Sequence, residues 1–317
     1  MEPILKVEHL KKCFKTSSGT LHAVDDINLS IQRGETLGVV GESGCGKSTF
    51  GRVILRLIPA TSGKVYFEGN DILQYDRRQI QKLRSDMQII FQDPYASLNP
   101  RMTVSELIAE PMIVNKTCKS KAELYQKVRS MMDTVGLASR LENAYPHELD
   151  GGRRQRIGVA RALVLDPKFI VCDEPVSALD VSIQAQILNL LMDLQDEFGY
   201  TYVFITHDLS VVKHISDCIA VMYLGQCIEY CESEELFRNP CHPYTKALLD
   251  AIPIPSLTSR GKERTLIRGE ITSPINPKPG CRFASRCEYC TERCTQGDIP
   301  MVDVGNGHLV SCVRMAK

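Results

Sequence analysis

The sequence contains a glycine-rich motif whose residue types suit phosphate binding. Residues 41–48 read Gly-Glu-Ser-Gly-Cys-Gly-Lys-Ser, follow an apolar run at residues 36–40, and precede apolar residues at helical spacing. In such a motif, backbone N–H groups curl around phosphate oxygens and a helix N-terminus adds partial positive charge. We predict that Lys47 neutralises the outer phosphates and that the Ser48 hydroxyl binds Mg²⁺. The predicted nucleotide-contacting residues are Gly41, Glu42, Ser43, Gly44, Cys45, Gly46, Lys47, Ser48 and Thr49.

Cys45 lies inside this loop, directly before the predicted helix. A helix N-terminus lowers the pKa of a nearby thiol, so we expect alkylation of Cys45 to block nucleotide binding and bound nucleotide to protect the thiol. The simpler interpretation is that Cys45 is a small residue that the loop tolerates.

Two acidic residues follow a second apolar run, at residues 169–172. At the end of a buried strand, Asp173 can orient Mg²⁺ and Glu174 can activate a water molecule. His207 ends a further apolar run, where its imidazole can reach a γ-phosphate. A histidine at a strand end is more often structural, so this role depends on its neighbours.

The elements that position these residues alternate between strands and helices. Short apolar runs at residues 169–172, 202–205 and 218–224 are separated by a stretch with helical spacing. This alternation predicts a parallel sheet and an α/β fold. The N-terminal part is rich in predicted strands, and residues 103–165 show mostly helical periodicity. Prolines multiply beyond Asn239, where we expect the chain to leave the main lobe.

Composition sets wider bounds on function. The 317 residues, 43% of them hydrophobic, suffice for one large domain plus an appendage. The 38 Lys and Arg residues balance the 38 Asp and Glu residues, which argues against a nucleic-acid partner. No apolar stretch approaches the roughly 20 residues of a membrane-spanning helix, and the N-terminus lacks an apolar signal segment, so we expect a cytosolic location.

The segment at residues 148–156 resembles the signature of ABC transporter ATPases, whose usual form is Leu-Ser-Gly-Gly-Gln. Gln92 resembles the Q-loop glutamine of that family, Asp180 the D-loop aspartate, and His207 the switch histidine, and Phe14 lies where the family places an aromatic ring against adenine. The resemblance implies ATP and Mg²⁺ as ligands. It implies Glu174 as general base, with Gln92 and Asp173 at Mg²⁺ and the attacking water, and contacts to ATP from Phe14, Asp150, Gly151, Gly152 and Asp180.

The family likeness also implies a P-loop NTPase RecA-like core with an antiparallel β subdomain and a helical insert. Two ATPases would pair head to tail, each presenting its signature to the nucleotide of the other. Here Asp150 replaces the usual serine and Arg153 the glutamine. Asp is as good an N-cap as Ser, but its carboxylate would repel phosphate unless Arg153 or Arg154 compensates, which suggests an asymmetric heterodimer.

The C-terminal part, including residues 239–249 and 279–283, resembles the extension of ATPases that drive oligopeptide and dipeptide importers, particularly their F-type subunit. We therefore predict an ABC ATPase domain at 1–238, with its helical subdomain at about 95–165, and a small Cys-rich domain at 239–317. The resemblance implies a sister ATPase, two permease subunits and an extracytoplasmic peptide-binding protein. It places the chain peripherally at the cytoplasmic face of the membrane.

Thirteen cysteines, an odd number, do not suggest disulfides in a cytosolic chain of this length, and five lie in the last stretch. Four of them match the cysteines of the family's extension, and four thiolates can hold a [4Fe–4S] cluster or a zinc ion. The resemblance favours the cluster, while zinc or reduced structural thiols remain alternatives. The expected ligands are Cys281, Cys287, Cys294 and Cys312.

Three other functions are compatible with some of these features. Related importers that carry nickel or another small solute use the same motor. A non-transport ABC ATPase is disfavoured because the chain has one cassette, a compact insert and no basic surplus. A nucleotide-binding regulator without catalysis is disfavoured by the presence of Glu174 and His207.

Overall fold

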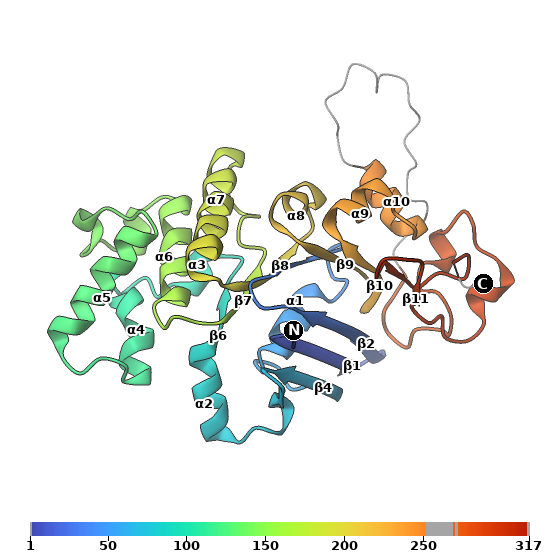
Figure 1. Ribbon diagram of the computed structural model, residues 1–317, viewed down its shortest axis with the longest axis horizontal. Coiled ribbons are helices and arrows are strands. Elements are labelled where there is room, and N and C mark those ends of the chain that lie inside the picture. The colour runs from blue at the N-terminus through green and yellow to red at the C-terminus, as the bar shows by residue number, and fades with distance from the viewer. Residues whose placement is uncertain (1, 252–268, 270–271, 316–317) are drawn as a thin grey trace, which may run out of the picture. The chain divides into compact units, whose positions relative to one another are not determined.

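The computed structural model describes residues 2–251, 269 and 272–315, which form two compact units. The first unit combines Met1–Leu73 with Thr206–Lys317, and the second is Gln74–Ile205. Each unit contains strands as well as helices (Figure 1), as the α/β prediction requires. The predicted domain boundary after residue 238 falls between two helices of the first unit and stays a prediction.

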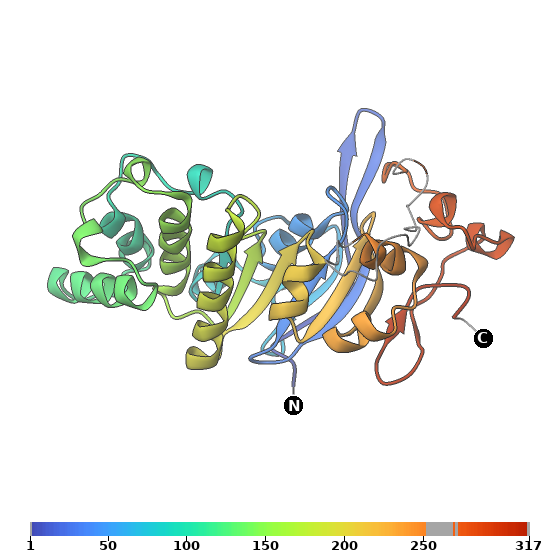
Figure 2. The ribbon, with the colours of Figure 1, turned by 90° about the horizontal axis from the view of Figure 1, so that it is seen from above.

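An antiparallel sheet occupies the N-terminal part of the first unit, with strand order β2-β1-β4-β5. Strands β1 and β2 form a long hairpin (Figure 2), whose ends pair Thr16 with Gly19 and Leu5 with Ile31. Apolar residues of this sheet are buried, and helix α1 packs near both hairpin strands. The bounds are β1 (Leu5–Thr16), β2 (Gly19–Ile31), α1 (Lys47–Ile54), β4 (Ser62–Phe67) and β5 (Asn70–Asp71).

The first unit also contains strands β3, β9, β10, β12 and β11, which are neighbours in that order. Strands β3 and β9 are parallel, and every residue of β3 is buried, which explains its continuous apolar sequence. Helices α8 and α9 pack against these strands. The bounds are β3 (Thr36–Val40), α8 (Leu209–Ile215), β9 (Cys218–Tyr223), β10 (Gln226–Glu232), α9 (Ser233–Arg238), α10 (Pro243–Asp250), β11 (Val302–Asp303) and β12 (Leu309–Val310).

One expectation about the chain's course is wrong. The prolines beyond Asn239 suggested that the chain leaves the main lobe, but β12 returns and pairs with β10, aligning Val310 with Glu229. A two-residue strand carries too little periodicity to be recognised in the sequence.

The second unit contains a parallel sheet with strand order β6-β7-β8, which confirms the predicted parallel pairing. All residues of β7 and β8 are buried, whereas β6 is only four residues long and was not predicted. The strand bounds are β6 (Met87–Ile90), β7 (Phe169–Asp173) and β8 (Thr201–Thr206), and the flanking helices are α2 (Arg77–Asp86) and α7 (Val181–Phe198).

The predicted helical insert is confirmed by three helices of the second unit that pack on one another (Figure 1). A capping box begins the first of them, since Thr103 and Glu106 each accept a hydrogen bond from the other's backbone N–H. The insert contains α4 (Val104–Asn115), α5 (Lys121–Thr134) and α6 (Gly151–Leu163), preceded by the short helix α3 (Pro94–Ser97). Among the described residues, no helix is both long and apolar enough to cross a membrane.

A buried ion pair links the segment just before β12 to strand β10. Glu229 is fully buried and accepts hydrogen bonds from the N–H groups of Cys241 (2.6 Å) and His242 (3.0 Å). His308 Nε2 lies 2.8 Å from the same carboxylate. Burial alone would raise the pKa of Glu229, but the donors, His308 first, hold it below the ordinary value, and the carboxylate in turn raises the pKa of His308.

We predict that Glu229→Gln lowers the free energy of unfolding by about 3 kcal/mol, because it removes the nearer carboxylate from a buried imidazolium and leaves only Glu235, 3.7 Å from Nδ1. Because the folded carboxyl has a depressed pKa, its contribution is present above about pH 4.5 and is lost as the pH falls through the lower folded value. Urea unfolding at several pH values measures both effects. Glu234→Gln, at an exposed position, should change stability little, and an equal loss in the two variants would contradict the prediction.

Candidate functional site

The phosphate loop joins β3 to α1 and is arranged around the side chain of Lys47. Gly46 precedes the helix with φ of 106°, in the left-handed region that glycine tolerates. The Lys47 ammonium is buried and donates to the carbonyls of Gly41 (2.7 Å) and Glu42 (3.0 Å). The lysine charge therefore lies inside the loop, as phosphate binding at the start of a helix requires.

Two glycines of the loop have no room for a side chain. A Cβ at Gly46 would lie 2.0 Å from the carbonyl oxygen of Ala23, and a Cβ at Gly41 would lie 2.1 Å from that of Met222. Strands β2 and β9 therefore press on the loop from outside and fix its curvature. This cradle of backbone and lysine, followed by the hydroxyl of Ser48 at the helix start, fits a nucleoside triphosphate with its Mg²⁺.

The expected lowering of the Cys45 pKa is wrong, while the expected effect of alkylation on nucleotide binding stays a prediction. The Cys45 side chain is buried, and this burial raises the pKa of the thiol, although the Lys47 charge opposes the effect. Desolvation of the thiolate thus outweighs the helix N-terminus at this position. The simpler interpretation, that Cys45 is a small residue that the loop tolerates, agrees with this environment.

The acidic strand end belongs to the second unit, where Asp173 is buried at the last position of β7. Glu174 follows with φ of 50°, a left-handed conformation that is uncommon for a non-glycine residue and clusters at functional sites. Its carboxylate accepts a hydrogen bond from Gln92 Nε2 at 3.1 Å. The predicted Q-loop glutamine and the predicted general base are therefore in direct contact.

The remaining predicted residues lie on both units. Phe14 is half-buried on β1, with the ammonium of Lys12 4.7 Å from its ring centroid. His207 is exposed directly after β8 and belongs to the first unit, as does the phosphate loop. Asp180 is the N-cap of α7 in the second unit. The predicted roles of these side chains stay predictions.

Helix α6 begins at the predicted signature. Asp150 is its N-cap, and its carboxylate accepts from the N–H of Arg153 at 2.8 Å. The Arg153 guanidinium lies 3.4 Å from the same carboxylate, whereas Arg154 is buried, donates to the carbonyl of Pro146 and stacks on Tyr95. Of the two arginines expected to compensate Asp150, Arg153 is the one that contacts it.

The signature glycines pack closely on the segment that carries Asp180. A Cβ at Gly152 would lie 2.8 Å from a methyl group of Ile183, and one at Gly151 would lie 3.1 Å from Leu179. The start of α6 is therefore fixed against the start of α7 within the second unit.

The four predicted cysteine ligands line one small cavity in the C-terminal extension. The backbone N–H of Cys281 donates to the carbonyl of Cys294 at 2.8 Å, which joins two of the ligand loops. Burial raises the pKa of Cys281 to about 11. At Cys294 burial acts in the same direction, but hydrogen bonds from Thr291 outweigh it and lower the pKa.

The spacing of these thiols bears on which group they fit. Zinc with Zn–S distances of 2.3 Å would bring its sulfur ligands to within about 3.8 Å of one another. Within the described ranges, the three potential ligands whose atoms lie within 4.8 Å are instead Glu229, Cys241 and His308. No three of the four predicted thiol ligands, all of which the structure describes, have sulfur atoms that all lie within 4.8 Å of one another.

Sequence reasoning missed two residues that contact the phosphate loop. Tyr244 Oη accepts from the N–H of Glu42 at 2.9 Å, and Arg286 pairs with the Glu42 carboxylate. Neither residue belongs to a phosphate-binding pattern, and Arg286 lies 244 positions along the chain from Glu42. No signal in the sequence indicates these contacts.

The phosphate loop and the acidic strand end, each at the C-terminal end of a parallel strand, define the class of P-loop nucleoside triphosphatases. A model of the family "ABC transporter" matches residues 24–177, and one of "Oligopeptide/dipeptide transporter, C-terminal region" matches residues 228–294. The oligopeptide transport ATP-binding protein OppF of Salmonella typhimurium is 51% identical over 98% of this chain and 96% of its own length.

Another relative, the dipeptide transport ATP-binding protein DppF of Haemophilus influenzae, is 48% identical over 99% of this chain and 97% of its own. Among solved structures, the dimeric ATP-binding cassette MJ0796 in a post-hydrolysis state with ADP and Pi matches with a TM-score of 0.67. It is 29% identical and covers 72% of this chain and 98% of its own. The chain belongs to the ABC transporter family of ATP-binding proteins and is an ABC ATPase.

The contacts of Asp150 predict how its replacement changes stability. Asp150→Ser keeps an N-cap oxygen and should leave the free energy of unfolding within about 0.5 kcal/mol, whereas Asp150→Ala should lower it by about 1 kcal/mol. Urea denaturation of the full chain measures both values. Equal losses in the two variants would show that the ion pair with Arg153, and not the cap, stabilises α6.

Proposed function

We propose that this chain hydrolyses ATP to power ABC-type import of dipeptides or oligopeptides across the cytoplasmic membrane. The observation that carries the proposal is the likeness to peptide-transport ATP-binding proteins over 98–99% of the chain, through the cassette and the extension alike. The proposed location is peripheral, at the cytoplasmic face. Nickel or another small solute is the alternative cargo, because the cargo is chosen by partners that this chain does not contain.

In the proposed mechanism, the residues of the family's motifs act on ATP. Lys47 neutralises the outer phosphates, and Ser48, Gln92 and Asp173 would hold Mg²⁺, which would supply charge stabilisation to the transferred phosphoryl group. Glu174 accepts the proton of the water that attacks the γ-phosphorus, while the bond from that phosphorus to the bridging oxygen breaks and ADP leaves. The hydrogen bond between Glu174 and Gln92 supports this role. His207 contacts the γ-phosphate, and the Phe14 ring stacks on adenine.

The proposed partners are a sister ABC ATPase, two permease subunits and an extracytoplasmic peptide-binding protein. In the pair of ATPases, each α6 N-terminus would face the nucleotide of the other subunit. Asp150 then brings a carboxylate close to phosphate, and its contact with Arg153 at 3.4 Å offsets part of that charge. We infer that the two ATP sites differ in turnover, and the Asp150→Ser variant assayed in the assembled pair tests this difference.

The role of Glu174 can be tested with a conservative substitution. Glu174→Gln should reduce ATP turnover of the assembled complex by at least about 100-fold, because the amide cannot accept the proton of water. Binding of MgATP should persist, since Lys47 and the loop glycines are unchanged. Glu197→Gln, an exposed position on α7, is the matched control and should retain turnover. Turnover of Glu174→Gln equal to that of the parent would refute the mechanism.

We also propose that Cys281, Cys287, Cys294 and Cys312 hold a [4Fe–4S] cluster. Their convergence on one cavity, without the close spacing that zinc needs, supports the cluster over a zinc ion. Such a group would cross-link three loops of the extension whose described segments contain few regular elements.

Protein purified without oxygen should contain about four iron atoms per chain and absorb visible light. Cys294→Ser should lose iron and absorbance together, because it removes a ligand. Cys290→Ser should retain both, since Cys290 is exposed and does not line the cavity shared by the four ligands. Stoichiometric zinc, or the absence of metal from freshly purified protein, would contradict the cluster.

A further inference from the structure

Glu42, the second residue of the phosphate loop, is bound at its backbone and at its side chain. Its N–H donates to Tyr244 Oη at 2.9 Å, and its carbonyl accepts from Lys47 at 3.0 Å. Its carboxylate accepts hydrogen bonds from both terminal nitrogens of Arg286, at 2.9 and 3.1 Å. Two of these three partners come from the C-terminal part of the chain, beyond residue 239.

The ion pair between Arg286 and Glu42 is bidentate and shielded from solvent. The side chains are 7% and 22% exposed, so the pair is screened less than a surface ion pair. Arg286 also donates to Tyr223 Oη at 3.2 Å, which fixes the guanidinium plane. A planar fork of this kind matches a carboxylate in direction as well as in charge.

The Tyr244 side chain is also fixed in place by its neighbours. It is fully buried, and its ring packs against Tyr223 (centroids 4.7 Å apart) and Phe283 (5.4 Å). Its helix, α10, has His242 as its N-cap, and His242 Nδ1 accepts from the N–H of Tyr244 at 3.0 Å. This aromatic cluster joins α10, β9 and the segment before Arg286. Tyr244 and Arg286, the two partners of Glu42 from the extension, are therefore positioned by the same cluster.

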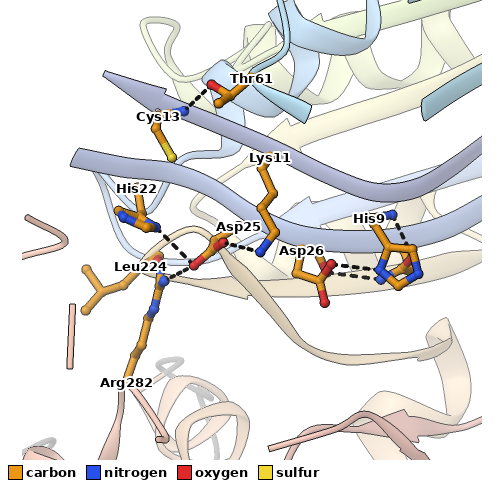
Figure 3. A network of polar contacts seen from close by, with 10 residues as sticks. His9, Lys11, Cys13, His22, Asp25, Asp26, Thr61, Leu224 and Arg282 are labelled. Atoms are coloured by element: carbon orange, nitrogen blue, oxygen red, sulfur yellow. Dashed lines mark hydrogen bonds and ion pairs between the residues drawn. The ribbon is translucent and has the colours of Figure 1, made fainter. Parts of the chain in front are cut away.

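A second arginine of the extension, Arg282, reaches the neighbouring hairpin (Figure 3). It contacts the Asp25 carboxylate, to which Lys11 and His22 also point, and donates to the carbonyl of Leu224. The adjoining turn continues to the phosphate loop, because the N–H of Gly225 donates to the carbonyl of Cys45 at 2.7 Å. The extension therefore contacts the loop directly at Glu42 and, through the turn at Leu224 and Gly225, indirectly at Cys45.

The charge of Glu42 gives these contacts a consequence for nucleotide binding. A carboxylate inside a phosphate loop repels the anionic ligand, and its attraction to the Lys47 ammonium competes with the phosphates. With Arg286 in place, the Glu42 charge is neutralised and its side chain is directed toward the extension. Tyr244 meanwhile fixes the Glu42 backbone, from which Lys47 is hydrogen bonded.

We propose that Arg286 and Tyr244 are positioning residues for ATP binding: the C-terminal extension holds the phosphate loop in its binding geometry and neutralises Glu42. The inference deepens the function proposed above and rests on it. It differs from a purely structural role, because the effect of losing Arg286 should depend on the charge of Glu42.

The test is calorimetric titration of the full chain with MgADP, which is not hydrolysed. Arg286→Ala should weaken binding about tenfold, the size expected for one lost charge-assisted interaction. The double variant Arg286→Ala with Glu42→Gln should recover to within about threefold of wild type, because the unpaired charge is gone. Arg293→Ala, at an exposed arginine of the same extension, should bind like wild type. Because wild type is titrated first, a failure of nucleotide binding itself is recognised before any variant is compared.

Circular dichroism establishes that each variant is folded. If Arg286→Ala does not fold, Arg286→Lys carries the test, since it keeps the charge, loses the fork and should weaken binding about threefold. Tyr244→Phe removes only the acceptor for the Glu42 N–H and should also weaken binding severalfold. Affinity of Arg286→Ala or Arg286→Lys equal to wild type would overturn the proposal, as would a double variant that binds no better than Arg286→Ala.

Discussion

The structure depends on how the phosphate loop is kept open around a buried ammonium. Lys47 is satisfied by carbonyls of its own loop, and glycines at positions 41 and 46 allow β9 and β2 to approach within distances that any Cβ would prevent. Within the loop, the N–H of Cys45 donates to the carbonyl of Glu42, whereas the N–H of Glu42 donates to Tyr244 Oη of the extension. The shape of the loop is therefore imposed by neighbouring strands and by the extension.

A comparable constraint operates at the acidic strand end. Glu174 has a left-handed backbone conformation, and its N–H donates to the carbonyl of Ile205 at 2.9 Å while its carbonyl accepts from Ser177. These bonds hold a conformation that a glutamate would otherwise avoid. The buried parallel strands β7 and β8 provide the rigid base, so the carboxylate that meets Gln92 projects from a fixed position.

The sequence allowed prediction of those parts whose physics is local. A strand that is buried on both faces has a continuous apolar sequence, so β3, β7 and β8 could be identified. A phosphate loop has glycines at fixed spacing, so residues 41–48 could be identified as well. Apolar residues after the phosphate loop recur at helical spacing as far as Ile58, but α1 ends at Ile54, because Arg56 adopts a left-handed conformation.

The parts that escaped prediction depend on contacts between distant segments. Burial of Cys45 reversed the expected direction of its pKa shift, and burial is set by residues far away in sequence. The return of β12 to β10 and the pairing of Arg286 with Glu42 link positions that share no periodicity. Long-range pairing of this kind follows from the fold as a whole, and a single sequence contains no record of it.

The ion pair of Glu42 has a consequence for the construction of chimeras. A cassette cut from this chain after α9 would carry a loop carboxylate without its cation and a Glu42 N–H without its acceptor. The first 238 residues are thus not an interchangeable module, even though they contain every motif by which a cassette is recognised. Exchange between relatives should keep residue 42 and residues 244 and 286 from the same parent.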